Sequence, residues 1–188
     1  HLVSVLLFGL LLLLLFSFAL STDPDLMRRM APGRFWLAVF FTSILTLEYS
    51  FRRETTDGQW DGLLLLGTDP KALYLGKMLA NLSLIVLMEA ALLPLMTILF
   101  DLPFTSNLAV VLFLGSLGIA TVGTFYAGLT ATFEQGRVLL PLLLFPMLVP
   151  VLLASVNATQ LILVDDRFEQ KIAWIKLLLA FDTIFLIG

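Results

Sequence analysis

The sequence predicts an all-α, polytopic integral membrane protein, a bundle of about six transmembrane helices. Hydrophobic residues make up 60% of the 188 residues and charged residues only 13%, whereas a soluble domain carries about 25% charged residues. The apolar residues are grouped in long runs, and a bilayer-crossing helix needs about 20 of them. Short polar stretches separate the runs and leave no room for a soluble catalytic domain. We therefore expect a single transmembrane permease domain over residues 1–188.

Two spans joined by a loop occupy the first part of the chain. Residues 2–20 form an uninterrupted apolar run, which is longer than the apolar core of a signal peptide. Residues 35–51 form the second span and open with an aromatic pair typical of a membrane interface. The polar residues 21–33 between them predict a loop around a short turn of helix, which Ser21, Thr22 or Asp23 could cap before Pro24. Because the chain begins without Met and inside an apolar run, we expect a further segment before it.

An amphipathic surface segment, residues 52–71, precedes the third span, residues 72–100. The segment mixes charges with Trp60 and a run of leucines, so it should lie along the membrane surface rather than cross it. Asp69 and Pro70 predict the start of the third helix. An Asp side chain can accept the free N–H groups of a first turn, and Pro fits where no N–H is needed.

Three more spans follow, over residues 108–133, 138–156 and 172–188. Only four residues separate the first two of these spans, which requires an antiparallel hairpin. Three prolines predict a bent fifth helix. The polar residues 157–171 predict a break before the last span. We expect that span, which contains Asp182, to be cut short at the end of the sequence.

Charge and residue types exclude several functions. The net charge of −3 gives no basic stripe for nucleic acid. The sequence contains no Cys, and its single His is residue 1, so it offers no disulfide framework or zinc site. Five cations would lie on one side of the predicted topology and six on the other, so the positive-inside rule does not orient the chain.

Residues 62–68 have the glycine spacing of a phosphate-binding loop. Thr68 and Asp69 stand where such a loop needs Lys and Ser or Thr to contact phosphate and magnesium. We therefore expect a non-catalytic chain, with any ATPase activity on a partner.

Glu89 is the clearest acidic residue at mid-depth in a predicted span. Ionisable residues there are costly and usually face protein or water. One interpretation is a proton or cation relay, or a polar contact for a substrate. The other is a neutral Glu bonded to a neighbouring helix. Pro94 frees the carbonyl group of Ala90 beside it, but we expect no second intramembrane carboxylate to complete a relay.

A stripe of small residues follows one side of the fourth span at intervals of four. Small residues let helix backbones approach closely, and hydroxyl groups can bond across the contact. The stripe predicts a packing face, either for another span or for a second copy of the chain in a homodimer. It consists of Ser116, Ala120, Thr124, Gly128 and Thr132.

Several short motifs resemble the CcmB family, the membrane subunits of the cytochrome c maturation ABC transporter, also called haem exporter protein B. The resemblance extends from about Ala31 through the fifth span. Its most specific motifs are Met30-Ala-Pro-Gly33, Leu47-Glu48, Phe51-Arg52, Asp57-Gly58 and Leu75-Gly-Lys77.

The resemblance implies an ABC-2-like, six-helix permease of a bacterial or organellar inner membrane, with both termini in the cytoplasm. Residues 52–71 would then contact the partner ATPase, CcmA, whereas composition alone favours a plain amphipathic loop. The implied docking residues are Arg52, Arg53, Asp57, Gly58, Trp60 and Asp61. The family works with CcmC, CcmD and the haem chaperone CcmE, and uses ATP hydrolysis to release haem-loaded chaperone.

Haem is thus the expected transported or handled ligand, and ATP would bind the partner subunit. The chain has no Cys, and its six Met residues are expected in the core or facing lipid. This composition argues against a tight haem-iron site and favours a role in transmitting ATPase motion. We expect no cofactor held by this chain.

Three alternatives remain open at this point. The first is the permease of another ABC-2-type exporter, for lipids, glycans or drugs. The second is a secondary transporter driven by protons through Glu89, with no ATPase. The third is a membrane scaffold with no transport role, which the kinked spans and the buried acid disfavour.

Overall fold

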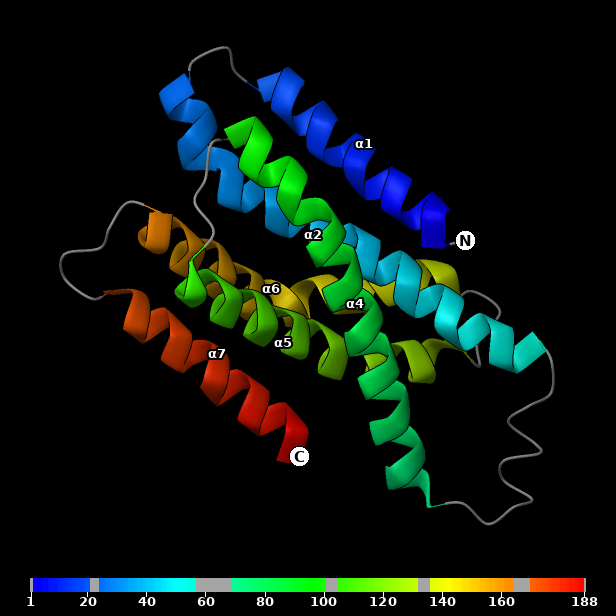
Figure 1. Cartoon of the computed structure of the whole chain (residues 1–188). Coiled ribbons are helices and arrows are strands. Elements are labelled where there is room, and N and C mark those ends of the chain that lie inside the picture. Colours follow the sequence, from blue (N-terminus) through cyan, green and yellow to red (C-terminus); the bar gives the residue numbers. More distant parts are fainter. Residues whose placement is uncertain are drawn as a thin grey trace.

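The computed structural model describes residues 2–20, 24–56, 69–100, 105–131, 136–163 and 170–187. Within these ranges, all residues except Asp69 and Thr105 lie in α-helices, which confirms the all-α class. Figure 1 shows the helices gathered into one bundle. They are α1 (Leu2–Leu20), α2 (Pro24–Thr56), α4 (Pro70–Phe100), α5 (Ser106–Ala131), α6 (Gly136–Leu163) and α7 (Gln170–Ile187).

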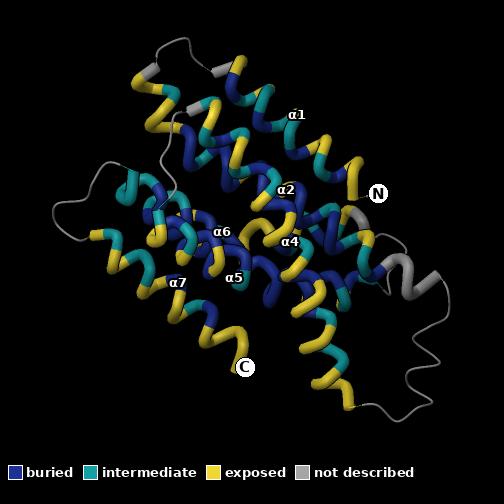
Figure 2. Tube along the Cα trace, in the orientation of Figure 1, coloured by how far each residue is buried: buried dark blue, intermediate teal, exposed yellow. Residues whose placement is uncertain are grey.

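Four of these helices are long and apolar enough to cross a membrane. The qualifying stretches are residues 25–51 of α2, 70–99 of α4, 106–131 of α5 and 138–163 of α6, and α1 contains a shorter apolar stretch. Exposed residues follow the outer sides of the helices (Figure 2), and many of them are large and apolar. Such a surface suits a lipid environment, so the chain is a multi-pass membrane protein.

Helix α2 differs from the prediction at both ends. The loop expected over residues 21–33 is wrong for residues 24–33, which are helical, and residues 52–56 of the expected surface segment continue the same helix. Pro24 stands at the first helical position with Asp25 in the first turn, an arrangement that favours a helix start. Pro32 removes only one backbone hydrogen bond, so the helix continues through it.

Helix α4 begins as the sequence predicts. The Asp69 carboxylate oxygen Oδ1 accepts a hydrogen bond of 3.0 Å from the backbone N–H of Lys71, and the Asp69 carbonyl accepts one of 3.1 Å from Leu73. Pro70 is the first helical residue. The helix then runs without a break to Phe100, through Pro94.

Helix α6 is longer than expected. The sequence predicted a break from residue 157, but the helix continues to Leu163 and contains all three prolines. Polar side chains at this end bond to the backbone of their own helix. Asn157 donates to the carbonyl of Leu153 at 2.7 Å, and Thr159 donates to that of Ser155 at 2.7 Å. These bonds satisfy the polar side chains internally, which a membrane helix requires.

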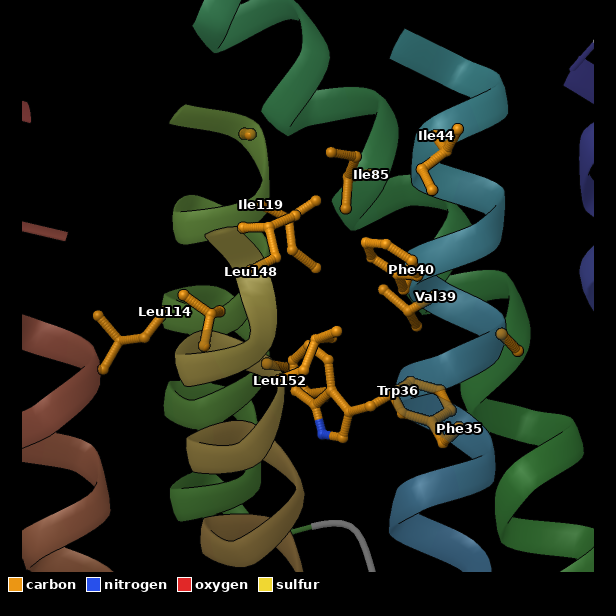
Figure 3. Packing of buried hydrophobic residues seen from close by; sticks show 14 of the residues in the cluster. Phe35, Trp36, Val39, Phe40, Ile44, Ile85, Leu114, Ile119, Leu148 and Leu152 are labelled. Atoms are coloured by element: carbon orange, nitrogen blue, oxygen red, sulfur yellow. The ribbon is translucent and has the colours of Figure 1, made fainter. Parts of the chain in front are cut away.

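The core lies between α2, α4, α5 and α6. Aromatic residues of α2 form its largest part, since Phe35, Trp36 and Phe40 are almost fully buried. Figure 3 shows Phe40 pointing toward Ile119 and Leu148, and the indole of Trp36 beside Leu152. Helix α1 packs on α2 and α4, while α7 packs on α5 and α6. Helix α5 contacts α2, α4, α6 and α7, and helix α2 contacts α1, α4, α5 and α6, so α2 and α5 together form the centre of the bundle.

Candidate functional site

Polar side chains inside the bundle gather on two sides of α5. This arrangement is possible because α5 is built largely of small residues, and most of the helix is buried. Small residues allow neighbouring helices to approach its backbone closely. The first side faces α4, and the second faces α2, α6 and α7.

The α4–α5 seam carries two polar pairs. Asn81 Nδ2 donates a hydrogen bond of 3.0 Å to Thr124 Oγ1. Two turns further along α4, the Glu89 carboxyl group lies beside the Ser116 hydroxyl. Glu89 lies eight residues after Asn81 on α4, and its partner Ser116 lies eight residues before Thr124 on α5. The two helices therefore run antiparallel. All four side chains are buried.

Glu89 is enclosed without a neighbouring charge of opposite sign. Its side chain is 3% exposed, and α4 packs against α1, α2 and α5. Described residues of α1 and α5 include no Asp, Glu, Lys, Arg or His, and α2 has none between Arg34 and Glu48. Neither Glu89 Oε1 nor Ser116 Oγ completes a well-formed hydrogen bond with a described residue. An ionised carboxylate would therefore be very costly here, and the site favours a neutral acid.

A second buried carboxyl group, Asp182 of α7, lies on the other side of α5. It is 3% exposed, and neither of its carboxylate oxygens has a hydrogen-bond partner among the described residues. Gly118 makes room for it, since a Cβ atom there would lie 2.9 Å from Asp182 Oδ1 and 3.1 Å from Val151 Cγ2. The bundle thus holds a second buried carboxyl group, but it lies across α5 from Glu89 and makes no contact with it that would form a relay.

Trp36 continues the polar groups on this side. Its Nε1 donates a hydrogen bond of 3.0 Å to Thr159 Oγ1, and its ring lies directly against Gly115. The buried Ser155 hydroxyl approaches the same glycine, at 2.7 Å from a Cβ placed there. This contact joins α2, α5 and α6 through one aromatic side chain, which Figure 3 shows pointing into the bundle.

The sequence matches the family described as CcmB protein over residues 1–187. The chain belongs to the CcmB family. It is 33% identical over 148 residues to Heme exporter protein B of Haemophilus influenzae, covering 78% of this chain and 67% of that protein. It is 29% identical over 182 residues to Heme exporter protein B of Pseudomonas aeruginosa, covering 96% and 82%, respectively. The corresponding Bradyrhizobium diazoefficiens protein is 30% identical over 160 residues, with 84% and 72% covered.

In this CcmB chain, the docking residues implied by the resemblance fall at the edge of the described structure or beyond it. Arg52 and Arg53 lie in the last turns of α2, where only the backbone is described. Asp57, Gly58, Trp60 and Asp61 lie outside the described residues. Their role stays a prediction.

The small-residue stripe faces other helices of the same chain. Ser116 and Thr124 lie against α4, as described above, and Ala120 is fully buried. The backbone of Gly128 lies under the ring of Phe51 in α2, because a Cβ atom there would be 3.2 Å from Phe51 Cε1. Thr132 lies outside the described residues. Contacts within the chain thus occupy the described part of the stripe.

Asn81 and the Trp36–Thr159 pair were not predicted from the sequence. Asp182 was recognised as an acid within the last apolar run, the same pattern that identified Glu89, but its burial against α5 was not predicted. Asn81 and Thr124 become partners only when the register of α4 against α5 is known. Among the described residues, no three of His, Cys, Asp and Glu are grouped to hold a metal ion.

Proposed function

We propose that this chain is the membrane permease subunit of an ABC exporter that handles haem and is driven by a separate CcmA-type ATPase. The observation that carries the proposal is the family match over residues 1–187. The name Heme exporter protein B of its relatives supports haem as the substrate. The multi-pass helical bundle supports the role of a permease.

The architecture supports an external source of energy. A phosphate-binding loop of an ATPase needs Lys followed by Ser or Thr, whereas Thr68 and Asp69 stand at these positions; residues 62–68 themselves lie outside the described structure. Helices α2 and α5, each with four helical neighbours and in contact with each other, give the bundle a route by which a displacement at one end can reach the other helices. The chain would therefore convert ATPase motion into movement of its helices.

The residue composition supports haem handling without tight coordination of its iron. Thiolate and imidazole are the usual strong axial ligands, but the sequence contains no Cys and a single His at residue 1. Partner subunits of the CcmC, CcmD and CcmE type would then hold haem. In this proposal the ATP-driven step releases the haem-loaded chaperone.

The docking segment provides the direct test. We expect Asp57→Ala and Trp60→Ala to reduce co-purification of the ATPase by about tenfold, because central interface residues commonly carry this much binding energy. Membrane insertion should be unaffected. Lys176→Ala is the matched control, since Lys176 is exposed on α7, far along the chain from this segment. Unchanged co-purification of both docking variants would refute the docking assignment.

Proton coupling through Glu89 is a second candidate function, favoured by a buried carboxyl group in uncharged surroundings. Glu89→Gln keeps the size and neutral form of the side chain but cannot exchange a proton. If the proton drives transport, this substitution abolishes it while depletion of ATP alone does not. The ATPase-driven permease predicts the reverse, with transport by Glu89→Gln near wild type and lost on ATP depletion.

A further inference from the structure

Lys77 connects the end of α2 to the start of α4. Its Nζ donates a hydrogen bond of 2.8 Å to the backbone carbonyl of Ser50. The same ammonium group lies 4.8 Å from the centre of the Phe51 ring, a distance at which the ring attracts a cation. We call this contact, formed by Lys77, Ser50 and Phe51, the α2–α4 clamp.

The clamp continues into α5. Phe51 is only 4% exposed, and its ring rests on the backbone of Gly128 at the distance given above. Phe51 therefore lies between the Lys77 ammonium group and α5. Replacing Gly128 by a larger residue would push this ring away, whereas glycine lets it sit directly on the helix.

Two more side chains of α4 attach the same part of the helix to α5. Tyr74 donates a hydrogen bond of 2.9 Å to the backbone carbonyl of Thr121, and Asn81 bonds to Thr124 at 3.0 Å. Tyr74, Lys77 and Asn81 follow one another at intervals of three and four, so they share one face of α4. The first three turns of α4 thus hold α2 and α5 together.

The position of the clamp gives it a role beyond packing. Residues 50 and 51 precede, and residue 77 follows, the segment from Arg52 to Lys71 that is proposed to meet the ATPase. A force applied to that segment reaches the bundle through α2 and α4. If these two helices were not joined, they could move separately, and the displacement would not reach α5 as a unit.

We propose that Lys77 is a coupling residue, which joins the ends of α2 and α4 so that they move together and displace α5 through Phe51. The inference rests on the proposed ATPase-driven function. Lys77 is a positioning residue in this account, because it acts through Phe51 and makes no contact with substrate or nucleotide.

The test uses the full transporter complex in native membranes, with Lys77→Met and Lys77→Arg compared with wild type. Met keeps an apolar stem but loses the ammonium group, whereas Arg keeps the charge, the hydrogen-bond donors and the attraction to the ring. Two quantities are measured: ATP hydrolysed, and haem-loaded chaperone released per ATP. Lys176→Met is the control for loss of a lysine on an exposed helix face.

We expect Lys77→Met to lower release per ATP by about tenfold, a size consistent with losing a charge-assisted hydrogen bond. Co-purification of the ATPase and the rate of ATP hydrolysis should remain near wild type, and Lys77→Arg should restore most of the release. A merely structural role would instead lower the membrane level of the protein and leave release per ATP near wild type in the complexes that remain, which would overturn the proposal.

Two further outcomes separate this inference from the proposed function. Release per ATP that is unchanged in Lys77→Met, with the ATPase still bound, would overturn the coupling role alone. Failure of the wild-type chain to retain any ATPase would overturn the proposed function, and the coupling role with it.

Should Lys77→Met accumulate poorly, Phe51→Leu tests the same contact path from Lys77 to α5, since it removes the aromatic ring while keeping an apolar contact with Gly128. Wild-type release per ATP in Phe51→Leu would then contradict the coupling role.

Discussion

Single side chains set the limits of packing around α5. Trp36 rests on Gly115 so closely that its ring atom Cζ3 would be 2.6 Å from a Cβ atom at that position. Real Cβ atoms cannot tolerate such an approach, and the bulky indole is held by its hydrogen bond to Thr159. Glycine is therefore required at position 115 because the Trp36 ring leaves no room for a Cβ atom, and not because of its backbone conformation.

Gly115→Ala should destabilise the protein by about 1–3 kcal/mol, the usual cost of overpacking a core. Gly76→Ala is the matched control, because Gly76 is also helical but has no atom within 4 Å of an added Cβ. That substitution should be neutral or stabilising by up to about 1 kcal/mol, since Ala favours a helix more than Gly. Thermal unfolding in detergent compares the two variants. Equal stability of both would show that Trp36 does not press on Gly115.

The buried acids show what a single residue can reveal from sequence. Glu89 stands out because an acid interrupts an apolar run, and the structure places it inside the bundle. Asp182 shows the same pattern near the end of the chain. Its burial, however, depends on where Gly118 of α5 and Val151 of α6 lie, which no local sequence pattern specifies.

At the scale of helices, the α4–α5 seam depends on register. Asn81 and Thr124 form their hydrogen bond only because α4 and α5 run antiparallel with these residues opposite one another. Hydrogen bonds between membrane helices contribute modestly, on average about 0.6 kcal/mol and at most about 1.7 kcal/mol. The seam is therefore held by close packing, and its polar pairs specify which residues face each other.

A double-mutant cycle of Asn81→Ala and Thr124→Ala should measure a coupling free energy of about 0.6–1.7 kcal/mol. Each free energy of unfolding is determined by denaturation in mixed micelles. The pair Ser83→Ala and Thr124→Ala serves as the control cycle, because Ser83 is exposed and bonds to the Leu79 carbonyl of its own helix. A coupling energy no larger than that of the control would show that α4 and α5 have a different register.

Helix ends show where sequence prediction succeeds and where it fails. The start of α4 was predicted correctly, since Asp69 and Pro70 act within one turn. The start of α2 was predicted only in part, because a short helical turn after Pro24 was expected within a loop, whereas the turn is continuous with the second span. A polar helix end and a polar loop have similar composition, and only the wider structure distinguishes them. For the same reason, residues 157–163, which include the polar Asn157, Thr159 and Gln160, were not recognised as part of α6.

For the whole molecule, composition alone predicts the membrane class. The 60% hydrophobic content and grouped apolar runs are consistent with helices that must satisfy their backbone hydrogen bonds internally. The arrangement of helices around α5 does not follow from composition, because it depends on which small residues meet which aromatic side chains. The connection to exporters of haem comes from family membership, and neither composition nor packing indicates it.

The most direct test of the central claim is to isolate the tagged protein from its native membrane in mild detergent and identify bound proteins by mass spectrometry. The account predicts an ABC-type ATPase together with haem-handling membrane subunits, recovered in the absence of any cross-linker. Retention of no ATPase, combined with proton-driven transport that Glu89→Gln abolishes, would contradict it.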